Sequence, residues 1–190
     1  MKDYRHVEVT DRFGNQFNID VSYSERSWCW HVRAYDGRRG GEITTLDPAI
    51  REGRSPFEAI ARATSSLLDP ADTKSDYSSG TRNVQLRVAD YQFSITATYD
   101  ESFWGWVASV ALLGDSEPTW DLWAKGEEQN RAFTTPYDCI GNAVAFTAAA
   151  AESLAYNPYP EETATAGLAR RLFFRSDLYT LGLPEQNQEQ

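Results

Sequence analysis

Apolar side chains occupy every second position in residues 17–23, and residues 93–99 repeat the arrangement. A two-residue period is typical of β-strands that bury one face. Short apolar stretches at 7–9 and 84–88 precede the two runs, and the turn-forming sequence RFGNQ lies before the first run. The same period continues after each run, so the pattern predicts two antiparallel meanders of at least three strands.

The two meanders share a longer signature. The stretches YSERSWCW (23–30) and YDESFWGW (99–106) both read Tyr-x-Glu-x-x-Trp-x-Trp, with an offset of 76 positions (99 − 23). Further along, SPFEAIARA (55–63) recurs as TPYDCIGNA (135–143), with an offset of 80 (135 − 55). Two matching blocks in the same order indicate a tandem duplication, although two units are too few for a solenoid.

Each unit ends in a pattern typical of a helix start. A hydroxyl residue stands at the N-cap, proline follows at the first helical position, and an acid occupies the third. These residues are Ser55, Pro56 and Glu58 in the first unit and Thr135, Pro136 and Asp138 in the second. The small residues of AFTAAAAESLA (145–155) favour close helix packing, so we expect the second helix to be central and covered by a C-terminal helix near 161–175.

The expected fold class is α+β, a tandem duplication of an antiparallel sheet of three or four strands followed by one helix, plus a C-terminal helix. Residues 119–126 are a candidate fourth strand, and residues 41–46 are its shorter counterpart. The expected division is a first sheet-helix unit at 1–70, a linker at 71–82, a second and acidic unit at 83–156, a C-terminal helix and extension at 157–183, and a disordered tail at 184–190.

Each unit contains a Trp-x-Trp pair. In an extended strand, residues two apart face the same side, so Trp28 and Trp30 should share a face, as should Trp104 and Trp106. We expect these faces to receive the helices, and truncation of Trp28 or Trp104 to destabilise the protein. The alternative is an aromatic platform that binds a partner.

Charge distinguishes the two units. The net charge of −10 is uneven, because residues 1–69 contribute −1 (10 basic − 11 acidic) and residues 83–156 contribute −7 (3 basic − 10 acidic). Residues 114–130 contain five acids around two tryptophans, which predicts a negative surface with aromatic anchors for a basic protein. The predicted partner-binding residues are Asp115, Glu117, Trp120, Asp121, Trp123, Glu127 and Glu128. An ordinary solvated hairpin is the alternative.

The sequence contains no recognisable motif for catalysis or metal binding. Cys29 and Cys139 are too few for a disulfide framework, and neither they nor His6 and His31 have zinc-ligand spacing. We therefore expect no enzymatic activity, no metal and no cofactor. The acidic charge disfavours direct nucleic-acid binding. No apolar run suits a membrane or a signal peptide, so we expect a cytoplasmic protein.

In size, charge and lack of catalytic motifs the chain resembles, as a class, small acidic phage- or plasmid-encoded inhibitors of host defence, of the anti-CRISPR or anti-restriction type. This resemblance implies a non-enzymatic protein that docks on a basic, nucleic-acid-handling protein or nuclease. Three alternatives stay open: an immunity protein or antitoxin, a structural or assembly protein that could form a homodimer, and a small-ligand binder with a cleft between the units.

Overall fold

The computed structural model describes residues 4–47, 50–68, 80–102, 104–113, 120–121 and 133–154. Its strands are β1 (Tyr4–Thr10), β2 (Gln16–Ser24), β3 (Cys29–Asp36), β4 (Glu52–Gly53), β5 (Thr81–Val88), β6 (Tyr91–Asp100), β7 (Gly105–Leu112) and β8 (Trp120–Asp121). Its helices are α1 (Pro56–Leu68) and α2 (Pro136–Leu154). The fold is α+β, and neither of these helices is long and apolar enough to span a membrane.

All the described strands belong to one antiparallel sheet rather than to two separate ones. The order is β4-β3-β2-β1-β5-β6-β7-β8, so the eight-stranded sheet is larger than the predicted three or four strands. The two halves join where β1 pairs with β5, from Glu8 opposite Arg87 to Thr10 opposite Gln85. Strand β5 begins at Thr81, inside the range expected to be a linker.

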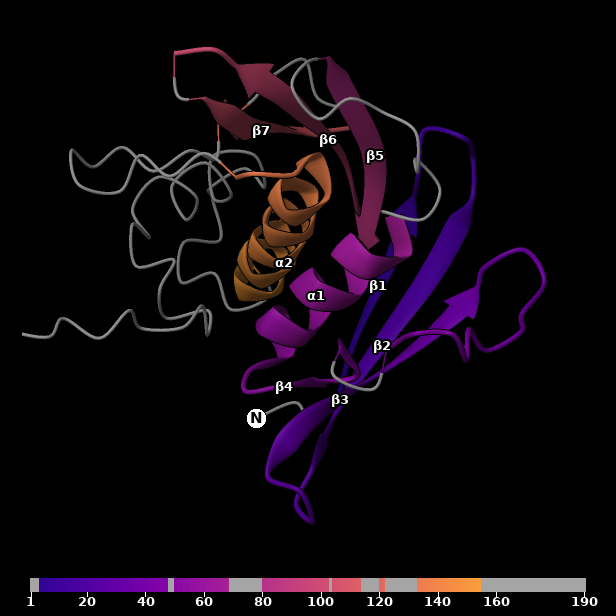
Figure 1. The fold of residues 1–190 in the computed structure, drawn as a ribbon. Coiled ribbons are helices and arrows are strands. Elements are labelled where there is room, and N and C mark those ends of the chain that lie inside the picture. The colour runs from indigo at the N-terminus through magenta and orange to yellow at the C-terminus, as the bar shows by residue number, and fades with distance from the viewer. Residues whose placement is uncertain are drawn as a thin grey trace, which may run out of the picture.

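The strands follow the same order outward from the junction on both sides. Because β1 and β5 are antiparallel, the β2–β3 turn and the β6–β7 turn lie at opposite ends of the sheet (Figure 1). Matching residue pairs flank these turns, with Tyr23 opposite Trp30 and Tyr99 opposite Trp106. The two halves therefore use the same local structure in opposite orientations.

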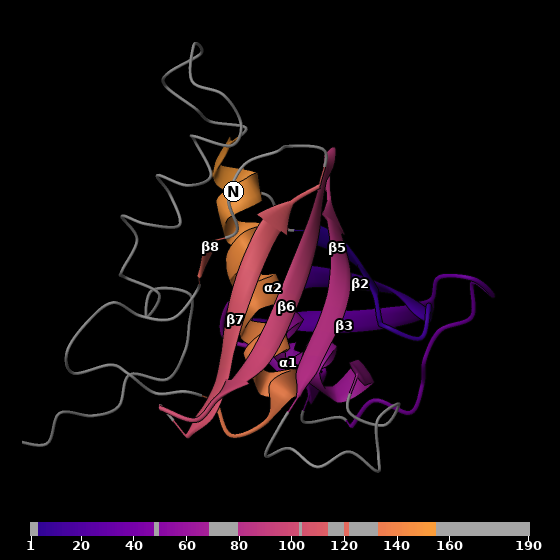
Figure 2. The same cartoon turned by 90° about the horizontal axis from the view of Figure 1, so that it is seen from above.

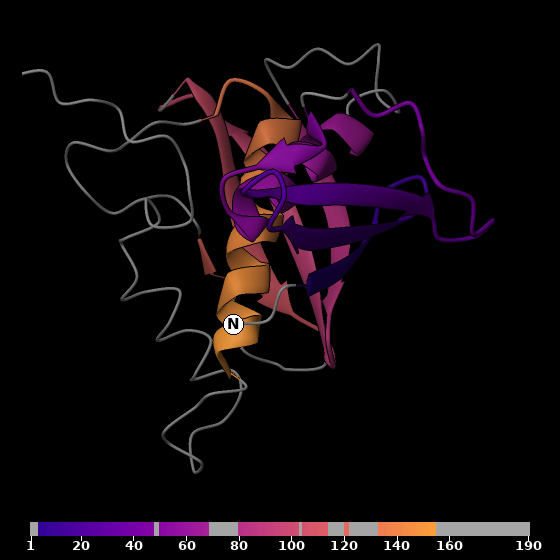
Figure 3. The ribbon, with the colours of Figure 1, turned by 90° about the horizontal axis from the view of Figure 1, so that it is seen from below.

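Both helices lie on the concave face of the strongly twisted sheet. Seen from above, the strands β5 to β7 lie in front of the helices (Figure 2), and seen from below, the strands of the first half do (Figure 3). Helix α1 packs on β2, β3 and β4, whereas α2 packs on β5, β6 and β7. One continuous core fills the space between the sheet and the helices.

The predicted helix starts are confirmed. Helix α1 begins at Pro56, where the Ser55 hydroxyl accepts a 3.0 Å hydrogen bond from the backbone N–H of Glu58. Helix α2 begins at Pro136, where the Thr135 hydroxyl accepts one of 3.1 Å from Asp138. The expected C-terminal helix near 161–175 lies outside the described residues.

The two helices approach each other at a glycine. A Cβ atom placed on Gly141 of α2 would lie 2.4 Å from the backbone oxygen of Ala61 in α1. Small residues continue on α2, where Ala143, Ala148 and Ala151 are all buried. The short side chains let the backbones of α1 and α2 come into contact, whereas the partner expected from the sequence was the C-terminal helix, which lies outside the described residues.

The tryptophan expectation is wrong for one member of each pair. Trp30 and Trp106 are buried, with 6% and 0% of their surface exposed, but Trp28 and Trp104 are 82% and 86% exposed. The reason is that Trp28 and Trp104 end the turns instead of starting the strands, which begin at Cys29 and Gly105. The two-residue period therefore does not extend back to them.

Two arginines complete the environment of the buried indoles. The guanidinium carbons of Arg5 and Arg82 lie 5.7 and 5.4 Å from the ring centroids of Trp30 and Trp106, respectively. Arg5 also forms a 2.6 Å ion pair with Glu152 of α2. Cation–π contacts thus recur at both buried tryptophans.

The fourth strand of the first half is not at residues 41–46. That stretch makes an isolated bridge between Tyr35 and Glu42, and strand β4 instead forms at residues 52–53. The guanidinium of Arg51 donates hydrogen bonds to the carbonyls of Leu46 and Thr44, which holds this segment as a turn beside β3. In the second half, β8 confirms strand structure within the predicted range 119–126.

The burial of the indoles predicts opposite effects of truncation within each pair. Trp30→Ala or Trp106→Ala should lower the free energy of unfolding by about 3–5 kcal/mol, because each removes a buried aromatic ring. Trp28→Ala or Trp104→Ala should change it by about 0.5 kcal/mol or less, as is usual for exposed side chains. Urea unfolding followed by circular dichroism measures all four. A large loss in the second pair would contradict their placement outside the core.

The helix contact predicts that Gly141→Ala destabilises the protein by about 1–3 kcal/mol, because the new methyl group meets the Ala61 carbonyl. Gly41→Ala is the matched control, since a Cβ there meets nothing within 4 Å. Thermal unfolding of both variants is the measurement. Equal melting temperatures for the two would show that the helices are not in close contact.

Candidate functional site

The predicted acidic site is described at two of its seven residues. Trp120 and Asp121 form β8, where they pair with Val110 and Ser109 of β7 at the outer end of the strand order. The other five, Asp115, Glu117, Trp123, Glu127 and Glu128, lie outside the described residues. Whether the seven residues come together therefore stays a prediction.

The described residues offer a different aromatic feature, the two exposed tryptophans. The first tip, defined as residues 25–28, joins Ser24 and Cys29, which are paired across β2 and β3. The second tip, residues 101–104, joins the paired Asp100 and Gly105 of β6 and β7. In both tips the tryptophan is the last residue before the strand.

Both tryptophans have an unusual backbone conformation. The φ angles are 56° at Trp28 and 54° at Trp104, in the left-handed region. This region costs an L-residue with a side chain about 1–2 kcal/mol, and glycine or asparagine is the usual occupant. Ala89 in the β5–β6 turn has a similar φ of 52°, so what distinguishes Trp28 and Trp104 is that a bulky, exposed aromatic side chain occupies such a position twice.

The backbone of the first tip is closed by a hydrogen bond. The N–H of Trp28 donates to the carbonyl of Ser24 over 2.9 Å. In the second tip the carboxylate of Asp100 accepts a 2.8 Å hydrogen bond from the backbone N–H of Ser102. The first contact joins Trp28 to the end of β2, and the second holds Ser102 against the end of β6.

The charges beside the two tips differ. Glu25 and Arg26 accompany Trp28, whereas Asp100 and Glu101 accompany Trp104. A cationic surface would thus meet a mixed first tip and an acidic second tip. Because the tips lie at opposite ends of the sheet, the two exposed tryptophans do not form one continuous aromatic surface (Figure 1).

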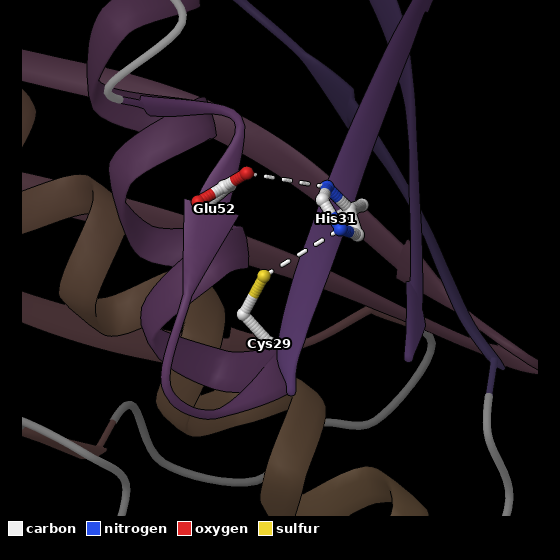
Figure 4. Close-up of side chains that lie close together, drawn as sticks. All are labelled: Cys29, His31 and Glu52. Atoms are coloured by element: carbon white, nitrogen blue, oxygen red, sulfur yellow. Dashed lines mark hydrogen bonds and ion pairs between the residues drawn. The ribbon is translucent and has the colours of Figure 1, made fainter. Parts of the chain in front are cut away.

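A second group of chemically active side chains lies on the face of β3 that points away from Trp30. The Cys29 sulfur lies 3.5 Å from Nε2 of His31, and a carboxylate oxygen of Glu52 lies 3.7 Å from its Nδ1. Figure 4 shows the imidazole between the thiol and the carboxylate. The Ser27 hydroxyl is also 2.6 Å from Nε2.

Sequence reasoning missed this group, although part of its signal was present. Cys29 and His31 are two residues apart in a strand, which puts them on one face. Glu52 comes from β4, where it pairs with His31, and nothing in the local sequence predicts that pairing. His31 faces away from the core side of Trp30, since Trp30 is buried and the imidazole is 37% exposed.

The other cysteine and histidine have different surroundings. Burial raises the pKa of Cys139 to about 12, so its thiol stays protonated at neutral pH. His6 lies on the sheet with its Nδ1 2.6 Å from a carboxylate oxygen of Asp20. Asp20 also accepts a hydrogen bond from the Tyr4 hydroxyl, which raises the pKa of Tyr4 to about 12.

Comparison with known proteins gives no relative. No protein-family model, curated protein or solved structure matches the chain.

Proposed function

We propose that the chain is a non-enzymatic, acidic inhibitor that docks on the basic surface of a nucleic-acid-handling protein, such as a nuclease of a host defence system. The observation that carries the proposal is the pair of exposed indoles at Trp28 and Trp104, each held in a strained backbone conformation. Tryptophan is enriched among residues that dominate binding energy at protein interfaces. The net charge of −10 favours a cationic partner.

The two tips and the acidic segment, residues 114–130, would contribute to binding in different ways. An indole that becomes buried supplies apolar contact, and at the first tip the hydrogen bond from Trp28 to Ser24 already closes the turn, which lowers the entropy cost of binding. The acids of residues 114–130 would act at longer range, by steering a basic surface toward the second half. Asp100 and Glu101 extend that negative charge to the second tip.

We further propose that the halves arose by tandem duplication. The repeated signature, the identical strand order on both sides of the β1–β5 pair and the matching left-handed tryptophans support this origin. Duplication would give the protein two copies of one contact point, facing opposite directions. A partner with two equivalent surfaces, or two partner copies, would match that geometry.

The binding proposal predicts that Trp28→Ala and Trp104→Ala each weaken the complex by at least about 10-fold, as expected for interface residues worth more than about 1.4 kcal/mol. Surface plasmon resonance against a panel of purified basic nucleases measures affinity, and inhibition of DNA cleavage gives the functional readout. Phe13→Ala is the control, because Phe13 is 56% exposed in the β1–β2 turn and belongs to neither tip.

Two results would contradict the proposal. One is a panel in which the wild-type protein inhibits no nuclease. The other is an inhibited nuclease that binds the Trp28→Ala/Trp104→Ala double variant as tightly as wild type.

The charge proposal predicts that Glu117→Lys slows association with the same partner and reduces its dependence on salt. Charges at an interface rim act mainly on the encounter rate, and the Debye length falls from about 10 Å at 0.1 M to about 3 Å at 1 M salt. The association rate at both salt concentrations is the measurement. Equal effects from Glu117→Lys and from a matched reversal in the first half would refute charge steering.

Glu42→Lys is the suitable matched reversal, since the Glu42 side chain is exposed. Asp36 in the same half is a poor choice. Its carboxylate accepts hydrogen bonds from the backbone N–H groups of Arg39 and Arg38, which lower its pKa, so Asp36→Lys would disrupt the turn as well as the charge.

A further inference from the structure

We propose that Cys29, His31 and Glu52 form a binding site for a zinc-class divalent transition-metal ion. One ligand atom from each residue can be chosen so that the three lie within 4.8 Å of one another. Thiolate, imidazole and carboxylate are all zinc ligands, and three protein ligands with a solvent position describe an open site. The proposal does not depend on the proposed inhibitor function.

The distances suit such an ion. Zinc bonds of about 2.0–2.3 Å in a tetrahedron separate neighbouring ligand atoms by roughly 3.3–3.8 Å. The 3.5 Å between the Cys29 sulfur and Nε2 of His31 already falls in this range. An ion bound to these two atoms would displace the Ser27 hydroxyl from Nε2 or take it as a further oxygen neighbour.

Glu52 would complete the set by a side-chain rotation. Its carboxylate now faces Nδ1 of His31 at 3.7 Å, on the other side of the ring, and a single imidazole binds one ion through one nitrogen. The Glu52 side chain is 58% exposed, so it can turn toward the sulfur side without disturbing the core. The backbone position of Glu52 is already set next to His31, because the two residues pair across β4 and β3.

The second half of the protein indicates that the fold does not require these side chains. Gly105 and Val107 occupy the positions in β7 that Cys29 and His31 occupy in β3. Trp106 bridges Phe133 as Trp30 pairs with Gly53, so the counterpart of Glu52 in the sequence is Ala132. All three metal-binding residue types are thus replaced together by residues that cannot bind a metal.

The alternative use of the same three residues is a Cys–His–Glu catalytic arrangement, with the thiol as nucleophile. In the present arrangement Glu52 does not orient the ring, because 3.7 Å is too long for a hydrogen bond, whereas the 3.5 Å between the Cys29 sulfur and Nε2 already suits a shared metal ion. The 37% exposure of His31 also leaves the imidazole accessible to solvent, whereas a catalytic base is usually enclosed with its substrate.

Binding would release the thiol proton of Cys29 to solvent, leaving a thiolate–metal bond. Affinity should therefore fall as the pH falls and protons compete for the ligands. The ion would link β3 to β4 just before helix α1, so it should also raise the melting temperature by favouring the folded state.

The test is titration of the full-length protein with Co²⁺ and with Zn²⁺. We expect one Co²⁺ per chain with the thiolate-to-cobalt charge-transfer absorption, displacement of Co²⁺ by Zn²⁺, and protection of Cys29 from iodoacetamide by Zn²⁺. Cys29→Ser should abolish the charge-transfer band. His31→Asn and Glu52→Gln should each weaken Zn²⁺ binding at least about 10-fold, as expected for loss of one ligand.

Two matched controls separate this site from non-specific binding. Cys139→Ala removes the buried thiol, and His6→Gln removes the histidine that lies beside Asp20 and Glu8 on the same sheet. Both variants should bind Zn²⁺ as wild type does. The proposal is overturned if wild type binds no stoichiometric ion, or if Cys29→Ser leaves binding unchanged. It is equally overturned if metal-free Cys29 is hyper-reactive through His31 and Glu52 while no ion binds, since that result assigns the cluster to thiol chemistry.

Discussion

The antiparallel pairing of β1 with β5 is the contact on which the rest of the architecture depends. The register spans Glu8 opposite Arg87 to Thr10 opposite Gln85, and this short ladder joins two half-sheets into one. It brings α1 and α2 onto the same concave face, where Gly141 allows their backbones to meet. It also sends the two tips to opposite ends of the sheet, so one pairing determines both the shared core and the separation of the exposed tryptophans.

Features set by nearby residues could be predicted from the sequence, and features set by distant pairing could not. The helix starts at Pro56 and Pro136 follow from local capping, and the strand period follows from alternation. The left-handed backbone at Trp28 breaks that alternation, and no composition rule anticipates tryptophan where glycine is usual. The β1–β5 junction and the Glu52–His31 pairing join residues far apart in sequence, so the single sheet and the cluster on β3 were not foreseen.

Comparison of the two halves distinguishes residues that the fold requires from residues that it does not require. Trp30 and Trp106 are both buried beneath an arginine and beside a tyrosine, so they serve the core in each half. Trp28 and Trp104 also recur, yet they are exposed and their backbone is strained. Recurrence alone is therefore a poor guide to structural need, and burial together with backbone conformation decides between the two roles.

The two halves differ in the residues at the starts of β3 and β7. Cys29 follows Trp28 directly, and Ser27 contacts His31, so the cluster on β3 is built into the base of the first tip. An ion bound there would tie the turn to β4 and restrict the motion of Trp28. The second tip has Gly105 at the corresponding position and acidic neighbours instead. In the proposed binding mode, a metal ion would control the tryptophan at the first tip and acidic charge would control the one at the second, so the two tips would bind under different conditions.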